Sequence, residues 1–264
     1  MMLSDIWTKT LWDQRRGLLG WAIGFAGVAL IYGGFYPFAA TPEYAELIEG
    51  LPPALAEAMG WDDISTPHGY LGATVFGILG PVLAIVMAIG IGTRAIAGSE
   101  EDGSLEMLIA HPVTRTRVVV QKAISLAMAT AMAGLVVMSA ILVLRGPIDL
   151  DMPLGHIAAA SLNLALMSLL FGALAILVGA IAGRRGLATS ITAAAAVVAY
   201  LANGLAPQVD ALAWLQNVSP FFWSDPTGTL RDGINPTNTL LLGGVAVGFV
   251  AAAVFAFNRR DVGV

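Results

Sequence analysis

The sequence of 264 residues contains no cysteine and few charged residues. The absence of cysteine excludes disulfides, thiolate metal sites and a cysteine nucleophile. Charged residues make up 12% of the chain and apolar residues 57%, whereas an ordinary soluble domain has about 25% charged residues. This composition argues against a water-soluble globule and against disorder, which needs low hydrophobicity. The net charge of −5 argues against a nucleic-acid partner, because phosphate binding needs a basic surface.

The sequence also lacks the motifs of common enzymes. It has no G-x-x-x-x-G-K-[ST] loop for a nucleotide and no G-x-S-x-G nucleophile elbow. His68, His111 and His156 lie in different segments without a partner at metal-ligand spacing. No ionisable residue lies at the middle of an apolar run, where ion-driven carriers usually have one. These absences argue against a metal site and secondary transport; an intramembrane enzyme and a non-transporting membrane scaffold or sensor remain as alternatives to a transporter.

The apolar residues are collected into six long runs without a charged side chain. A helix that crosses a bilayer needs about 20 mostly apolar residues, and each run reaches that length. The sequence therefore predicts an all-α membrane protein with a single transmembrane domain, 1–264. The predicted spans are residues 18–38, 69–97, 117–144, 154–183, 186–206 and 237–258.

The basic residues predict the orientation of these spans. If the N-terminus is cytoplasmic, only Arg145 and Arg231 of the 13 Lys and Arg residues lie on the outer side. Lys and Arg near spans resist translocation, so both termini are predicted to be cytoplasmic. The outer segment 39–68 agrees with this orientation, because it has six acids and no Lys or Arg.

Three segments outside the predicted spans carry further signals. Residues 2–17 have apolar side chains at spacings of three and four, which predicts an interfacial helix on the inner leaflet; a frayed leader is the alternative. Residues 39–68 contain capping signals for two short outer helices. Residues 207–236 are rich in aromatic and apolar side chains. They indicate an extracellular re-entrant segment buried in protein, or an aromatic belt that anchors the helix ends.

The predicted cytoplasmic loop, 98–116, begins with acids and continues with a short amphipathic helix. The three acids Glu100–Asp102 precede the predicted helix Ser104–Ala110, which Pro112 ends. An apolar face with an acidic rim suits docking on a partner; the alternative is a solvated loop whose acids cap a helix. The apolar face consists of Leu105, Leu108 and Ile109.

Polar residues inside the predicted spans are few. They either line a path through the membrane or hydrogen-bond between helices. They are Asn163 and Ser168 in the fourth span, and Thr189, Ser190, Thr192 and Asn203 in the fifth.

The loop and the segments around it contain residues in a recognisable order. In the loop and just after it these are Ile96–Gly98, Glu100–Glu106, Leu108, Ala110, Pro112, Val113, Arg115 and Lys122. Elsewhere they are Leu51–Pro53, Leu55, Gly60, Gly69, Tyr70 and Arg259–Val262. Together they resemble the signature of ABC-2 type permease subunits of ATP-binding cassette transporters. The resemblance covers the whole chain, with a departure at Ser104, where Thr is commoner.

This resemblance implies a permease subunit of an exporter in the plasma membrane of a prokaryote. Such a chain has no cofactor of its own, because two separate ATPase subunits bind ATP and magnesium. A second permease subunit, identical or related, completes the transporter. The few polar groups in the spans favour a lipophilic or amphipathic compound, such as a drug, lipid or peptide, as the cargo.

The resemblance also implies roles for individual residues. The helix in the loop is expected to be a coupling helix, seated in a groove of the ATPase, with Leu105 and Leu108 as apolar anchors and with acids as a charged rim. The expected coupling residues are Glu100, Glu101, Asp102, Gly103, Ser104, Leu105, Glu106, Leu108 and Ile109. The candidate residues of the translocation path are Asn163, Ser168, Thr192, Asn203, Phe221 and Phe222.

Single cysteines can test the predicted orientation, because the chain has none of its own. A cysteine in place of Glu57 should react with a membrane-impermeant thiol reagent added to intact cells. A cysteine in place of Asp102 should react only after permeabilisation. The opposite labelling pattern would refute both the orientation and the cytoplasmic position of loop 98–116.

Overall fold

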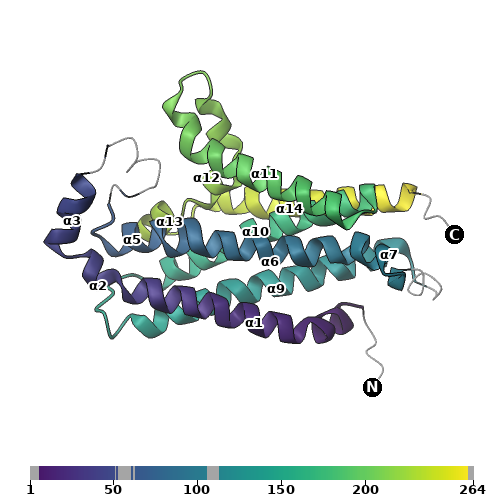
Figure 1. The fold of residues 1–264 in the computed structure, drawn as a ribbon, viewed down its shortest axis with the longest axis horizontal. Helices are drawn as coiled ribbons and strands as arrows, with labels where there is room; N and C mark the ends of the chain where they lie inside the picture. Colours follow the sequence, from purple (N-terminus) through teal and green to yellow (C-terminus); the bar gives the residue numbers. More distant parts are fainter. Residues whose placement is uncertain (1–5, 51, 53–60, 62, 106–112, 261–264) are drawn as a thin grey trace.

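The computed structural model describes residues 6–50, 52, 61, 63–105 and 113–260, and this part of the chain consists of helices and turns without a strand (Figure 1). Six helical segments in it are long and apolar enough to cross a membrane. They are Ile6–Ala39, Pro67–Glu101, Arg115–Leu144, Leu154–Ala182, Arg185–Gln208 and Pro236–Arg259. Each predicted span coincides with one of these segments, so the predicted all-α fold with six spans is confirmed.

Helix α10 (Leu154–Ala182) lies at the centre of the bundle. It packs against α6 (Gly80–Thr93), α9 (Arg115–Leu144), α11 (Arg185–Leu205) and α14 (Pro236–Arg259). Its most apolar stretch is 67% buried, whereas the corresponding stretches of α11 and α14 are only 17% and 22% buried. Most of the surface of the last two spans therefore lies exposed on the outside of the bundle.

Small residues let the helices approach α10 closely. A Cβ atom on Gly92 of α6 would clash with the backbone carbonyl of Gly172 of α10. A Cβ atom on Gly134 of α9 would lie 2.6 Å from the carbonyl oxygen of Ser161. Without a hydrophobic drive between helices in lipid, such backbone contacts are a main source of packing energy.

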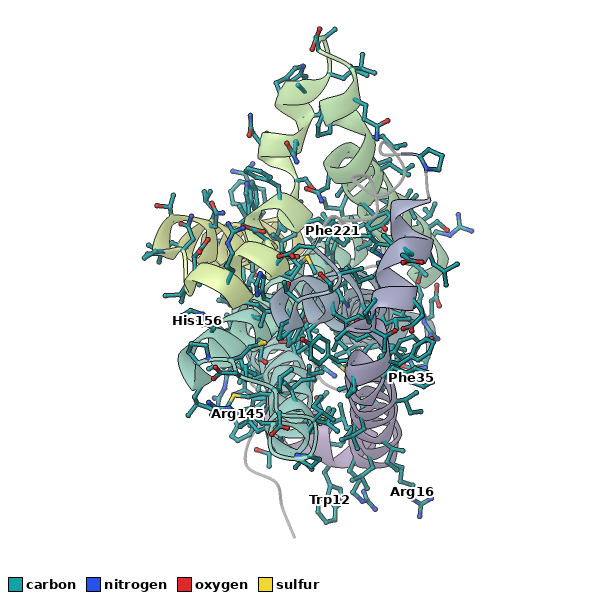
Figure 2. All side chains as sticks on the ribbon, turned by 90° about the vertical axis from the view of Figure 1, so that its left-hand side faces the viewer. Trp12, Arg16, Phe35, Arg145, His156 and Phe221 are labelled. Carbon is teal, nitrogen blue, oxygen red and sulfur yellow. The ribbon has the colours of Figure 1, made fainter. Side chains whose placement is uncertain are left out.

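Helix α1 (Ile6–Gly34) corrects the expected interfacial helix at residues 2–17. Residues 6–17 continue the first span without a break, and residues 2–5 lie outside the described part. The backbone N–H of Ile6 donates to the side chain of Gln121 at 2.6 Å, and the Ser125 hydroxyl donates to the carbonyl of Trp7 at 3.3 Å. The apolar stripe at the start of α1 thus packs on α9, while Trp12 and Arg16 project away from the bundle (Figure 2).

The second span is not a uniform α-helix. It consists of α5 (Pro67–Ala73), a π-helical turn at Val75–Leu79, α6, a second π-helical turn at Arg94–Gly98 and α7 (Ser99–Glu101). Pro81 follows the first π-turn and has no N–H to donate to the preceding turn. A π-turn accommodates such a gap, and π-turns within helices occur often at functional sites.

The two ends of the bundle differ. The two termini lie at the same end as α7, which is called here the inner end (Figure 1). The opposite, outer end holds the short helices α2 (Tyr36–Ala39), α3 (Pro42–Glu49), α5 and α13 (Pro226–Asp232). Two 3₁₀ turns at Ala206–Gln208 and Ala213–Val218, followed by α12 (Pro220–Ser224), form a hairpin that projects from the bundle beyond α11.

Candidate functional site

An ion pair between Glu100 and Arg260 joins the second span to the residue that follows the sixth. The Arg260 guanidinium donates two hydrogen bonds to the carboxylate, at 3.0 and 2.6 Å. The two side chains are 24% and 26% exposed. A bidentate, partly buried ion pair keeps a fixed geometry better than a solvent-exposed ion pair does.

Arg260 is itself held by two further spans. Its backbone carbonyl and that of Phe257 accept hydrogen bonds from the guanidinium of Arg115, at the start of α9. Its guanidinium lies over Gly183, where a Cβ atom would clash with it. Gly183 also has a φ of +61° and ends α10, so both its conformation and its missing side chain are needed there.

Glu101 ties the fifth span to the same place. Its carboxylate accepts the backbone N–H of Arg185, the first residue of α11, at 2.8 Å. The residue before α11, Arg184, provides no side-chain cap, so an acid from another segment satisfies this free N–H and the positive end of the helix dipole. These contacts define an inner cluster that joins five of the six spans. It consists of Glu100, Glu101, Arg115, Gly183, Arg185 and Arg260.

The residues after Glu101 form a tight turn. The backbone N–H of Ser104 donates to the carboxylate of Asp102 at 3.0 Å, and hydrogen bonds from Ser104 lower the pKa of Asp102. The Ser104 hydroxyl reaches the carbonyl of Ser99 at 3.3 Å. Gly103, with a φ of +72°, supplies the left-handed conformation that the turn needs.

This turn corrects the expected roles of three coupling residues. Leu105 is 1% exposed and belongs to the apolar core of the chain, so it is not an exposed anchor. The turn at Gly103 directs the chain back into the bundle and so buries Leu105. Glu100 is bonded to Arg260, and Glu101, although exposed, accepts the N–H of Arg185, so both acids already have partners within the chain. Asp102 is exposed, and Glu106, Leu108 and Ile109 lie outside the described residues.

A cavity of about 480 Å³ opens at the outer end. Its wall combines the first π-turn of the second span, the end of α11 and the hairpin with α12. Three candidate path residues, Asn203, Phe221 and Phe222, line it. Phe221 lies where the hairpin meets the bundle (Figure 2), with its ring 5.3 Å from that of Tyr200 and 6.1 Å from that of Phe171.

The other three candidate path residues do not line this cavity. The buried amide of Asn163 donates to the Ser224 carbonyl at 3.2 Å and to the Thr229 hydroxyl at 3.3 Å, and it accepts from Thr239 at 2.8 Å. Ser168 donates to a carbonyl of its own helix, and the buried Thr192 hydroxyl has no hydrogen-bond partner. All three therefore lie inside the helix packing of this chain. For Asn163 this agrees with the alternative role, which is hydrogen bonding between helices.

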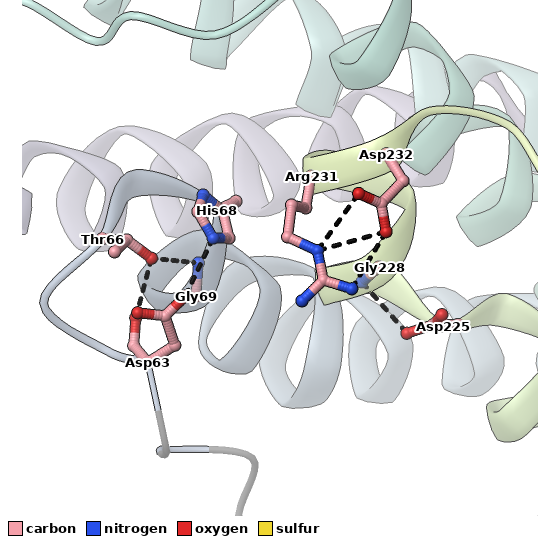
Figure 3. Close-up of polar contacts among 8 residues, drawn as sticks. All are labelled: Asp63, Thr66, His68, Gly69, Asp225, Gly228, Arg231 and Asp232. Atoms are coloured by element: carbon pink, nitrogen blue, oxygen red, sulfur yellow. Dashed lines mark hydrogen bonds and ion pairs between the residues drawn. The ribbon is translucent and has the colours of Figure 1, made fainter.

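The outer end carries polar contacts that sequence reasoning missed (Figure 3). The His68 ring lies 2.8 Å from the Asp63 carboxylate. Arg231 donates to both oxygens of Asp232, which lowers the pKa of Asp232 and raises that of Arg231. Asp225 accepts the backbone N–H of Gly228 at 3.1 Å and caps α13. An acid directly before a proline at a helix start is a sequence signal for such a cap.

These structural features define the class of protein to which the chain belongs. Six long apolar helical segments, with α10 at their centre, define a multi-pass membrane protein. In the described residues no group of three or more His, Cys, Asp or Glu side chains is placed to hold a metal ion.

Comparison with known proteins identifies the family. The family model described as ABC-2 family transporter protein matches residues 6–262, nearly the whole chain, and the chain belongs to this family. A comparison with curated proteins found no match. The predicted resemblance is thereby confirmed. Membership of the family supports a permease role in a membrane and implies partnership with ATP-binding subunits.

Replacement of Asn163 by Ala should destabilise the bundle. The change removes three hydrogen bonds, to the Ser224 carbonyl, Thr229 and Thr239, although Thr229 still donates to the Ser224 carbonyl; the expected cost is about 1–3 kcal/mol. Thermal unfolding of the purified chain in detergent, followed by tryptophan fluorescence, measures the effect. Ser161→Ala is the matched control on the same helix, because the buried Ser161 hydroxyl has no partner; equal melting temperatures for the two variants would contradict this role of Asn163.

Proposed function

We propose that this chain is the permease of an ABC exporter, with loop 98–116 as the element that couples it to the ATPase. The observation that carries the proposal is the inner cluster. Just before the loop's central segment, Glu100 bonds to Arg260 at the end of α14 and Glu101 bonds to the start of α11. Arg260 in turn accepts from Arg115 of α9 and lies over Gly183 of α10. A force applied to this loop is therefore passed to several spans at once.

The contact with the ATPase is assigned to segment 106–112. Leu105, just before it, is buried, and Val113, just after it, packs against the apolar core. The residues on both sides of the segment are therefore anchored to the bundle, so a movement of the segment would be transmitted to the bundle. Within it, Leu108 and Ile109 are proposed as the apolar anchors and Glu106 as a charged contact. The exposed Asp102, which precedes the segment, is proposed as a further charged contact.

The remaining parts of the proposal follow from the outer surfaces. Asn203, Phe221 and Phe222 on the wall of the outer cavity are proposed as part of the path. The apolar surface of α11, which buries only three of its residues, suits a second permease subunit, identical or related. The cargo is proposed to be lipophilic or amphipathic, and the membrane to be the plasma membrane of a prokaryote, with both termini cytoplasmic and with ATP and magnesium on the partner.

The first test asks whether the ATPase subunit needs segment 106–112 in order to co-purify with this chain. Leu108→Asp should abolish co-purification with the co-expressed ATPase subunit of the transporter, because burial of a leucine contributes about 1.5–3 kcal/mol. The variant should still insert in the membrane. Leu47→Asp, at an exposed leucine of the outer helix α3, is the matched control. Full recovery of the ATPase by Leu108→Asp would show that the segment is not the coupling element.

The second test addresses the inner cluster. Glu100→Gln should keep the complex with the ATPase but lower the amount of cargo moved per ATP hydrolysed, because it removes the ion pair with Arg260 and one of its two hydrogen bonds. The exchanged pair Glu100→Arg with Arg260→Glu should restore part of this ratio. Arg259→Gln, at the exposed neighbouring residue, should leave the ratio unchanged. A Glu100→Gln transporter as well coupled as the wild type would contradict the role of the cluster.

A further inference from the structure

The wall of the outer cavity has an aromatic side. Four aromatic residues line it: Phe76, Tyr200, Phe221 and Phe222. Tyr200 and Phe221 meet edge to face, with an angle of 76° between their planes, and Phe221 also contacts Phe171 of the central helix. Aromatic faces bind flat apolar groups and also attract cations through the ring quadrupole.

Asp225 is the charged residue of this wall, and no Lys, Arg or His is among the residues that line the cavity. In the part of the chain that the structure describes, its carboxylate accepts the backbone N–H of Gly228 and forms no ion pair. Arg231, the nearest basic residue along the chain, is bound to both oxygens of Asp232 instead. Among the described residues Asp225 therefore has no ion-pair partner, and Arg231 acts on it only through a longer-range electrostatic interaction.

The negative charge is more than the helix cap requires. Asn, Ser or Thr caps a helix as well as Asp does, because the cap needs only an acceptor oxygen. Asp225 has a φ of +29°, and Asn tolerates positive φ at least as well as Asp. Neither the cap nor the backbone therefore explains why a carboxylate lies in the wall of the cavity.

The predicted outer segments are mostly acidic. By sequence, eleven of the 18 acids fall in the segments between spans that are predicted to be outside, together with two basic residues, Arg145 and Arg231. Clefts surrounded by charge of one sign raise the local concentration of the opposite ion. The eleven acids are Glu43, Glu46, Glu49, Glu57, Asp62, Asp63, Asp149, Asp151, Asp210, Asp225 and Asp232.

We propose that the outer cavity binds an amphipathic organic cation, with Asp225 as its counter-ion and the rings of Tyr200 and Phe221 as its apolar contact. The inference rests on the proposed function, because it names the class of cargo for the cavity on the path. An anion would find no basic partner on this wall, and a neutral chain would cover Asp225 without compensating its charge. The volume of about 480 Å³ suits a ligand of the size of a drug.

Dye binding to the full-length chain in lipid nanodiscs tests the proposal. Rhodamine 6G, a lipophilic cation, is compared by fluorescence anisotropy with rhodamine B, a zwitterion of the same ring system. The wild type should bind rhodamine 6G about tenfold more tightly than rhodamine B. Asp225→Asn should bind rhodamine 6G about tenfold more weakly, and its affinity for rhodamine B should not fall. Phe221→Leu should weaken the binding of both dyes.

Controls separate a local effect from changes in folding or general charge. Asn keeps the acceptor for Gly228, so Asp225→Asn should unfold at the wild-type temperature. Asp210→Asn removes an acid from the same outer segment but not from the cavity wall, and should leave the affinity for rhodamine 6G unchanged. Equal affinity of the wild type for both dyes, no measurable binding of rhodamine 6G, or wild-type affinity in Asp225→Asn would each overturn the proposal.

The measurement uses neither ATP nor an ATPase, so its outcome is independent of the proposed function. If Asp225→Asn binds the cation normally while Leu108→Asp loses the ATPase, the cation site is wrong and the exporter stands. If binding depends on Asp225 while Leu108→Asp keeps the ATPase, the cation site stands and the coupling mechanism is wrong.

Discussion

The ion pair between Glu100 and Arg260 is the contact on which the inner end of the bundle depends. Its two hydrogen bonds join residues that are 160 positions apart, and both side chains are about three-quarters buried. If either side chain were replaced, the other would be left as a partly buried charge without a partner, which is unfavourable. Because Arg260 also covers Gly183 and accepts from Arg115, the pair fixes the ends of four spans relative to one another.

The central helix imposes a second constraint, which acts along the length of the bundle. Gly172 of α10 meets α6 and α9, because a Cβ atom there would contact Ala88 and Leu126. Nearer the outer end, Asn163 of the same helix holds α12, α13 and α14 through three hydrogen bonds. In lipid the hydrophobic effect does not hold helices together. Close backbone packing and the hydrogen bonds of this amide stabilise the association of the helices instead. The spans that lack such contacts, above all α11, keep an exposed apolar surface.

Composition and charge were enough to predict the six spans, because the length of apolar runs is set by the bilayer. They were not enough to predict what the polar groups bind. Glu100 and Arg260 both belong to the matching residues of the family resemblance, but a single sequence gives no sign that they touch. Leu105 has the spacing of an exposed anchor and is buried, because one left-handed glycine, Gly103, redirects the chain. The stripe at the start of α1 suits either a lipid surface or α9, and periodicity does not separate the two.

Both ends of the bundle are tied by hydrogen bonds that connect distant parts of the chain. At the inner end, side chains join residues 84 to 160 positions apart. At the outer end, His156 and Asn163 of the central helix bond to residues 61 to 76 positions away, while Thr66, Asp225 and Asn235 cap their own helices within three residues. Bonds between spans break when the spans shift against one another, whereas a cap survives when its helix moves as a unit. The central helix therefore holds both ends, and the short capped helices of the outer cavity are the elements that can shift at the smallest cost in hydrogen bonds.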